Sequence, residues 1–204
     1  MTPTLLTGLV VAAVAWGALF GMSRAAFWSR AAVAGLAIGV YGVVAQWSSI
    51  GDLLRPTIVD VAIGVAGAVV LYGVFWAGDR FLRRFFPVAA AQVDALYEVR
   101  SVRASERLPI PAVLLLVGPC EELFWRGLVQ ARAGFAVALA CYAAVHLWER
   151  KAVLVVAAVV GGAFWGALFA WRGTLVAPII SHALWDLAVV VWFPFADRED
   201  GTDS

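Results

Sequence analysis

The sequence predicts an all-α fold: a polytopic membrane bundle of about seven transmembrane helices. Hydrophobic residues make up 63% of the 204 residues and charged residues only 14%, against about 45–50% and about 25% in soluble domains. Three stretches also lack any charged side chain, namely Met1–Ser23, Ala31–Gly51 and Val61–Gly78. Each is long enough to cross about 30 Å of hydrocarbon as a helix. These observations exclude a soluble domain and a disordered chain.

Seven spans account for all the apolar runs. Lipid cannot satisfy free backbone groups and no alternating strand pattern occurs, so each span should be a helix. We place the spans at Thr4–Met22, Ala31–Gly51, Thr57–Gly78, Pro111–Val129, Gly134–Trp148, Ala152–Trp171 and Thr174–Phe195. Glycine pairs of the G-x-x-x-G type, at Gly17–Gly21, Gly35–Gly39 and Gly162–Gly166, are interpreted as packing within one chain, and we expect a monomer.

The chain is divided into three parts. Residues 1–107 hold the first three spans and a basic loop, residues 108–195 hold the last four spans, and residues 196–204 form a polar tail expected to be disordered. We interpret the connection Asp79–Leu108 chiefly as an ordinary basic loop. Its Val93, Leu96 and Tyr97 stand at helical spacing, so a short helix on the membrane surface is the alternative.

The basic residues predict the orientation. Eleven lie in the loops that share a side with the C-terminus: Arg24, Arg30, Arg80, Arg83, Arg84, Arg100, Arg103, Arg107, Arg150, Lys151 and Arg198. Three lie on the opposite side, at Arg55, Arg132 and Arg172. Positive residues favour the cytoplasmic side, which puts the N-terminus outside and the C-terminus in the cytoplasm. A single lysine among 15 basic residues indicates a GC-rich prokaryotic source, and therefore a prokaryotic plasma membrane. A net charge of +1 excludes a nucleic-acid partner.

Ionisable side chains interrupt the apolar spans of the C-terminal half. They are Glu121, Glu122 and Arg126 in the fourth span, His146 in the fifth, and His182 and Asp186 in the seventh. The two histidines are the only ones in the chain. Each charge at the bilayer centre costs about 2.5–3.5 kcal/mol on insertion scales, so such residues are typical of a functional site.

The spacing of these residues predicts which side chains meet. Glu122 and Arg126 are four residues apart and should form an ion pair that stabilises the helix face. Glu121 points about 100° away from Glu122 and is left without that partner. It is therefore the carboxylate best placed to take and give a proton.

The same spacing of four joins Tyr142 to His146, and His182 to Asp186. We expect the three helices to direct these groups into one cavity together with Glu121. Asp186 either takes part in the chemistry or only orients His182.

These patterns resemble a known family. Its members, the CAAX protease and bacteriocin-processing (CPBP or Abi) proteins, carry E-E-x-x-x-R, F-x-x-x-H and H-x-x-x-N/D on a core of four membrane helices. The corresponding residues here are Glu121-Glu122-x-x-x-Arg126, Tyr142-x-x-x-His146 and His182-x-x-x-Asp186. The resemblance covers about Leu108–Phe195, the last four spans.

The resemblance implies an intramembrane endopeptidase of the glutamate type with a four-helix catalytic core. Glu121 would be the general base, helped by His146, while His182 and Asp186 would stabilise the oxyanion. The supporting residues would be Glu122 and Arg126, which hold the helix face, and Tyr142, which replaces the usual phenylalanine. Asp186 stands where asparagine is common, and an ionised aspartate donates no hydrogen bond. It is either protonated or confined to orienting His182.

The implied partner is a membrane-anchored protein or peptide, processed at its C-terminus or leader within the lipid bilayer. We expect no cofactor; zinc bound by Glu121, His146 and His182 is the alternative, although no H-E-x-x-H pattern is present. Two other functions remain open. One is a transporter or proton-coupled carrier, because buried acids and histidines also build ion relays. The other is an inactive membrane scaffold or immunity protein.

Overall fold

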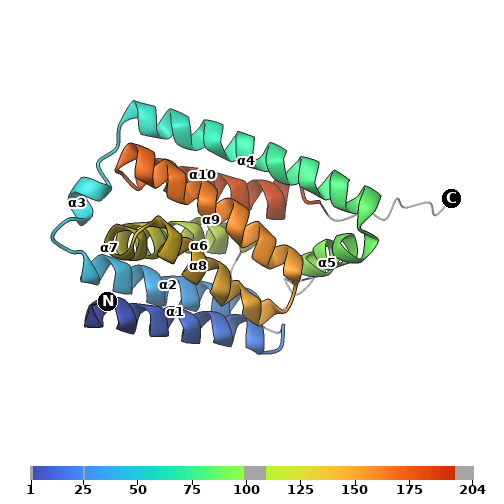
Figure 1. Ribbon diagram of the computed structural model, residues 1–204, viewed down its shortest axis with the longest axis horizontal. Helices are drawn as coiled ribbons and strands as arrows, with labels where there is room; N and C mark the ends of the chain where they lie inside the picture. The colour runs from blue at the N-terminus through green and yellow to red at the C-terminus, as the bar shows by residue number, and fades with distance from the viewer. Residues whose placement is uncertain (1, 25, 99–108, 196–204) are drawn as a thin grey trace.

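The chain folds as a bundle of helices aligned with one long axis (Figure 1). The computed structural model describes residues 2–24, 26–98 and 109–195. In the N-terminal half the helices are α1 (Pro3–Gly21), α2 (Phe27–Ala45), α3 (Ile50–Leu53), α4 (Ile58–Phe85) and α5 (Pro87–Tyr97). In the C-terminal half they are α6 (Ile110–Glu122), η2 (Leu123–Gln130), α7 (Ala131–Ala133), α8 (Phe135–Val145), η3 (His146–Glu149), α9 (Ala152–Arg172), α10 (Val176–Leu187) and η4 (Ala188–Trp192). The all-α prediction is confirmed over these residues, where no strand occurs.

Four of the helices are long and apolar enough to cross a membrane: α1, α2, α4 and α9. Two shorter apolar helices span Phe135–Glu149 and Val176–Trp192. With the segment formed by α6 and η2, every predicted span overlaps a helical segment. The chain is thus a multi-pass membrane protein, and seven crossings stay a prediction.

One predicted boundary was wrong, and one helix is longer than its predicted span. The second span was expected to reach Gly51, but α2 ends at Ala45 because Gln46 leaves helical geometry and its side-chain amide donates to the backbone oxygen of Leu123 at 2.8 Å. The third span was placed at Thr57–Gly78, and the helix that contains it, α4, continues to Phe85.

The interpretation of Asp79–Leu108 as an ordinary loop was also wrong. After α4 the chain turns at Pro87, which suits the first turn of a helix, and forms α5. Residues 99–108 of this connection and the tail at 196–204 lie outside the described residues.

Ion pairs show how the connections are grouped at the two ends of the bundle. The Arg24 guanidinium contacts Glu98 at 3.2 Å and Glu149 at 3.7 Å. Arg24 lies between the first and second predicted spans, Glu98 between the third and fourth, and Glu149 between the fifth and sixth, so these three connections lie together. At the other end Arg172 Nε donates to the buried carboxylate of Asp60 at 2.7 Å. This is the grouping on which the predicted orientation rests; which end faces the cytoplasm stays a prediction.

Glycines bring α2 into direct contact with α6. A Cβ atom placed on Gly39 would lie 2.5 Å from Cys120 Sγ, and one on Gly35 would lie 3.2 Å from the Cα atom of Val117. The Gly162–Gly166 pair of α9 packs in the same way against α8, close to the rings of Tyr142 and Phe135. These two G-x-x-x-G pairs therefore pack within the chain, as predicted. Such close approach needs the absence of a side chain.

This packing predicts a difference between two Gly→Ala variants. Gly39→Ala should lower the free energy of unfolding by about 1–3 kcal/mol, because its methyl group would overlap Cys120. Gly21→Ala is the control, since nothing lies within 4 Å of its added Cβ. Thermal unfolding of both purified variants in detergent measures the effect. Equal melting temperatures would contradict the packing described above.

Candidate active site

The ionisable residues predicted from the sequence lie on α6 with η2, on η3 after α8, and on α10, all in the C-terminal half. Glu121 and Glu122 are the last two residues of α6, and Arg126 follows in the π-helix η2. π-helical turns inside helices are frequent at functional sites. His182 and Asp186 lie on α10, which Gly118 of α6 allows to approach closely: a Cβ on this glycine would lie 3.3 Å from Asp186 Oδ2.

Glu122 is the centre of the polar network. Its side chain is fully buried, and its Oε1 atom accepts a hydrogen bond from Arg126 Nη1 at 3.0 Å. The same oxygen lies 2.7 Å from Nδ1 of His182, which is 60 residues further along the chain. The predicted pair with Arg126 is confirmed. The contact with His182 was not predicted, and it makes Glu122 the link between α6 and α10.

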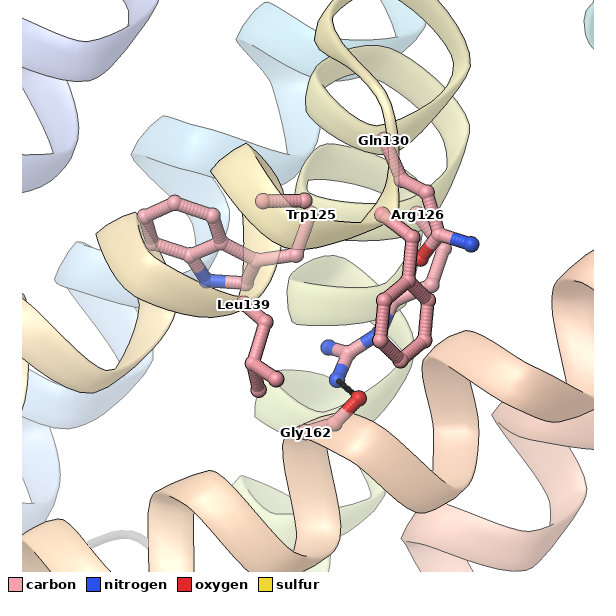
Figure 2. A pocket seen from close by; sticks show the side chains of 7 residues that line it. Trp125, Arg126, Gln130, Leu139 and Gly162 are labelled. Atoms are coloured by element: carbon pink, nitrogen blue, oxygen red, sulfur yellow. Dashed lines mark hydrogen bonds between the residues drawn. The ribbon is translucent and has the colours of Figure 1, made fainter.

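Arg126 is held on all sides. Its Nη2 atom donates to the backbone oxygen of Gly162 on α9 at 3.0 Å, as Figure 2 shows. Its guanidinium also lies over the Tyr142 ring, 4.7 Å from the centroid. The small gap beside it leaves no room for water and is lined by Trp125, Arg126, Gln130, Phe135, Ala138, Leu139 and Gly162. Arg126 is therefore a support that joins η2, α8 and α9.

The His182 ring is fixed by more than its bond to Glu122. The Trp165 indole of α9 stacks on it, with ring centroids 3.6 Å apart and planes 16° apart. The indole Nε1 donates in turn to Ser181 Oγ at 3.3 Å. On the other side of the imidazole, Nε2 lies 3.8 Å from Asp186 Oδ2, too far for a direct hydrogen bond. Asp186 is thus a neighbour without a direct hydrogen bond, while Glu122 is the partner that orients the ring.

His146 lies where α8 ends and the 3₁₀ turn η3 begins. Its Nδ1 atom is 2.7 Å from the backbone oxygen of Tyr142. A carbonyl only accepts, so Nδ1 carries the proton and the Nε2 atom of the neutral ring keeps its lone pair. The ring packs against Trp16 and Phe20 of α1, with centroids 6.4 and 6.2 Å away. The first helix, to which the sequence assigned no role, therefore helps to place this histidine.

Glu121 is also buried, and like Glu122 it has an Oε2 atom without a hydrogen-bond partner. It differs from Glu122 because, among the described residues, no arginine or histidine forms an ion pair with it. Its neighbours include His182, Asp186 and Glu122, and the Tyr142 hydroxyl lies beside it. In the part of the chain that the structure describes, no direct hydrogen bond joins Glu121 to His146. Tyr142 adjoins both, since its ring centroid is 4.8 Å from that of His146.

The three side chains named as the alternative zinc ligands are not arranged as a metal site. Within the described ranges 2–24, 26–98 and 109–195, no three histidine, cysteine, aspartate or glutamate side chains lie close enough to share one ion. The ring nitrogens Nδ1 of both histidines are also engaged by Tyr142 and Glu122.

Comparison with known proteins identifies the segment that holds this site. Residues 104–188 match the family model described as type II CAAX prenyl endopeptidase Rce1-like. The predicted resemblance is confirmed. No curated protein and no solved structure matches the chain. The Rce1-like segment contains every predicted site residue, and it is similar to a family of proteases.

Two residues that the sequence analysis did not single out belong to the site of the Rce1-like segment. They are Trp165, stacked on His182, and Ser181, which accepts from the indole of Trp165. The signal available in the sequence was weak. Trp165 lies between Gly162 and Gly166, and this glycine pair indicated close packing of α9 without showing on which residue it packs.

The stack predicts a change in the NMR spectrum of His182. Because the chain has two histidines, selective labelling gives two resolvable sets of imidazole signals. Trp165→Leu should shift the His182 signals, since an aromatic ring shields protons above its face, and should leave those of His146 in place. Trp125→Leu is the control, because this equally buried indole makes edge-to-face contacts with Phe124 and Tyr142 and does not stack on His182. Unchanged His182 signals in Trp165→Leu would show that the rings do not stack.

Proposed function

We propose that the protein is an intramembrane endopeptidase that cleaves a membrane-associated protein or peptide near its C-terminus or leader. The observation that carries this proposal is the buried Glu121 carboxylate, which keeps Oε2 without a partner and, unlike Glu122, forms no ion pair with an arginine or histidine among the described residues. A base of this kind needs a free acceptor atom and a fixed position. The match of residues 104–188 to the Rce1-like family supports the same activity.

The reaction follows from the positions of these groups. The Glu121 carboxylate removes a proton from a water molecule, and the water oxygen attacks the carbonyl carbon of the scissile bond. Negative charge then develops on the carbonyl oxygen. When the tetrahedral intermediate collapses, the C–N bond breaks and the proton passes from Glu121 to the leaving nitrogen. His146 assists through Nε2, which is the acceptor nitrogen of the neutral ring.

His182 is assigned to the developing oxyanion. A protonated imidazole has N–H groups on both nitrogens, so Nδ1 donates to Glu122 while Nε2 remains for the substrate. Donors held in place before the reaction stabilise such charge without reorganisation. We assign Asp186, whose Oδ2 atom lies 3.8 Å from Nε2, to stabilising the positive charge of the protonated His182 ring.

The match of residues 104–188 to prenyl endopeptidases supports an assignment of the substrate class. The site residues are buried between the helices of a membrane bundle, and a lipid anchor brings a peptide bond into the bilayer around them. We therefore assign a prenylated or otherwise membrane-anchored peptide as the substrate, and the test uses a prenylated peptide as its probe.

Glu121→Gln should abolish cleavage. The amide keeps the size of the side chain but cannot take the proton, and loss of a general base lowers rates by about 10²–10⁴-fold. The assay follows release of a quenched fluorophore from a farnesylated C-terminal peptide and from the same peptide without the lipid. Glu98→Gln, an exposed glutamate of the same charge, serves as control and should keep the wild-type rate. Wild-type cleavage by the Glu121→Gln variant would refute the assignment.

Chelation separates the glutamate mechanism from a zinc mechanism. Because the described residues offer no set of three ligands, we expect cleavage at the same rate after treatment with a strong chelator. The rate with the farnesylated peptide is measured before chelation, after chelation and after addition of Zn²⁺. Loss of activity that Zn²⁺ restores would replace the glutamate mechanism by a metal-dependent one.

A further inference from the structure

Helix α4 is longer than a bilayer crossing requires. Its 28 residues extend for about 42 Å at about 1.5 Å per residue, against about 30 Å of hydrocarbon. The uncharged stretch Val61–Gly78 fills the hydrocarbon, so the last two turns, Asp79–Phe85, extend to the level of the lipid headgroups. Helix α5 follows directly at Pro87.

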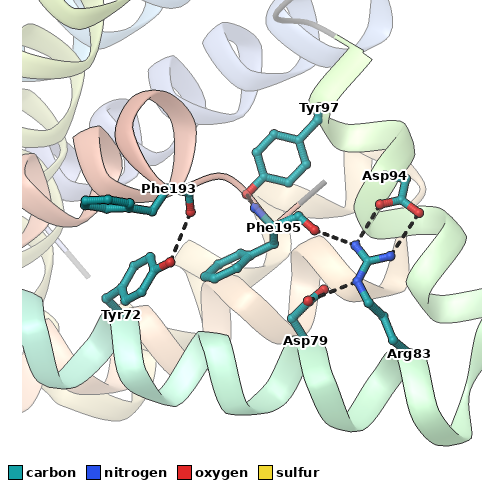
Figure 3. Close-up of polar contacts among 7 residues, drawn as sticks. All are labelled: Tyr72, Asp79, Arg83, Asp94, Tyr97, Phe193 and Phe195. Carbon is teal, nitrogen blue, oxygen red and sulfur yellow. Dashed lines mark hydrogen bonds and ion pairs between the residues drawn. The ribbon is translucent and has the colours of Figure 1, made fainter. Parts of the chain in front are cut away.

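We call the junction between the end of α4 and α5 the corner. Polar contacts fix its inner face (Figure 3). Arg83 donates to Asp79 at 3.0 Å and to Asp94 of α5 at 2.7 Å, and it also donates to the backbone oxygen of Phe195. The Tyr97 hydroxyl donates to the backbone oxygen of Val189 in η4 at 2.9 Å. The acids of this corner therefore face inward, where Arg83 neutralises them.

The outer face has the opposite character. It carries six residues, which we call the corner patch: Trp76, Arg80, Phe81, Arg84, Phe85 and Phe86. All are exposed, and the Phe81 ring lies 5.0 Å from Phe85 and 5.7 Å from Phe86. The Arg80 guanidinium lies 4.8 Å above the Trp76 ring. Neither Arg80 nor Arg84 forms an ion pair within residues 2–24, 26–98 and 109–195.

We propose that the corner patch binds the headgroups of anionic phospholipids. Its position at the end of the hydrocarbon puts Trp76 at the membrane interface, where tryptophan is enriched, and the phenylalanine rings against the acyl chains. Arg80 and Arg84 are one helical turn apart on the exposed face, and each contributes about 1 kcal/mol toward an anionic membrane surface. Arg83 contributes nothing to this attraction, because Asp79 and Asp94 already neutralise it. Headgroup binding by the patch fixes the depth of α4 in the membrane and, through the bonds of Arg83 to Asp94 and Phe195, also that of α5 and the segment after η4.

The experiment uses the purified full-length chain in neutral detergent and a short-chain phosphatidylglycerol as probe. Equilibrium binding is followed by native mass spectrometry for wild type, Arg80→Gln, Arg84→Gln and the double variant. We expect the dissociation constant to rise about 5-fold in each single variant and about 30-fold in the double variant. Arg55→Gln is the control, because this exposed arginine lies at the other end of the bundle beside Asp52 and should keep wild-type affinity.

Three further measurements decide what occupies the patch. Phosphatidylcholine of the same chain length should bind wild type more weakly than phosphatidylglycerol. Added salt should weaken the binding of phosphatidylglycerol and leave that of phosphatidylcholine unchanged. Inorganic phosphate should not displace the lipid, because it lacks the acyl chains that contact the rings. Unchanged affinity in the double variant, equal binding of the two lipids, or displacement by phosphate would each overturn the proposal. None of these results depends on whether the chain cleaves peptides.

Discussion

The buried carboxylate of Glu122 is the constraint on which the rest of the site depends. One oxygen accepts from Arg126 of η2 and from His182 of α10, and Arg126 continues the network to the backbone of α9. Replacing a buried ionic network by well-packed apolar groups is often neutral or stabilising, whereas removing one partner costs about 3–5 kcal/mol. Stability alone therefore does not account for these charges. Their effect is positional: they fix how α6, η2, α9 and α10 are rotated relative to one another.

Contacts within one helix could be predicted from the sequence. The pair of Glu122 and Arg126 follows from a spacing of four residues, and so does the proximity of Tyr142 to His146. The link from Glu122 to His182 could not be predicted, because it crosses 60 residues and depends on how closely α10 approaches α6 at Gly118. Sequence spacing thus indicated which residues belong to the site, while packing decides which of them touch.

The errors in the fold have the same origin. Hydropathy located the helical segments, but α4 continues past the end of the third predicted span, where the first charge is Asp79. The helix continues because Arg83 pairs with Asp79 on the same helix and with Asp94 on the next one. Likewise Gln46 ends α2 by bonding to the backbone of Leu123, a partner that no local pattern indicates. Tertiary contacts of polar residues therefore decide where these helices end.

The two adjacent glutamates show how the fold separates support from chemistry. Consecutive helical residues point about 100° apart, so Glu121 and Glu122 face different neighbours although both are buried. Both keep a buried Oε2 atom without a partner, at a cost of roughly 1–3 kcal/mol for each unsatisfied acceptor. Glu122 bonds to Arg126 and His182 through Oε1, so its position is fixed by two cationic or donor groups. Glu121 has the Tyr142 hydroxyl beside it but forms no ion pair among the described residues. It is therefore the carboxylate of the two that remains available to take a proton from a water molecule.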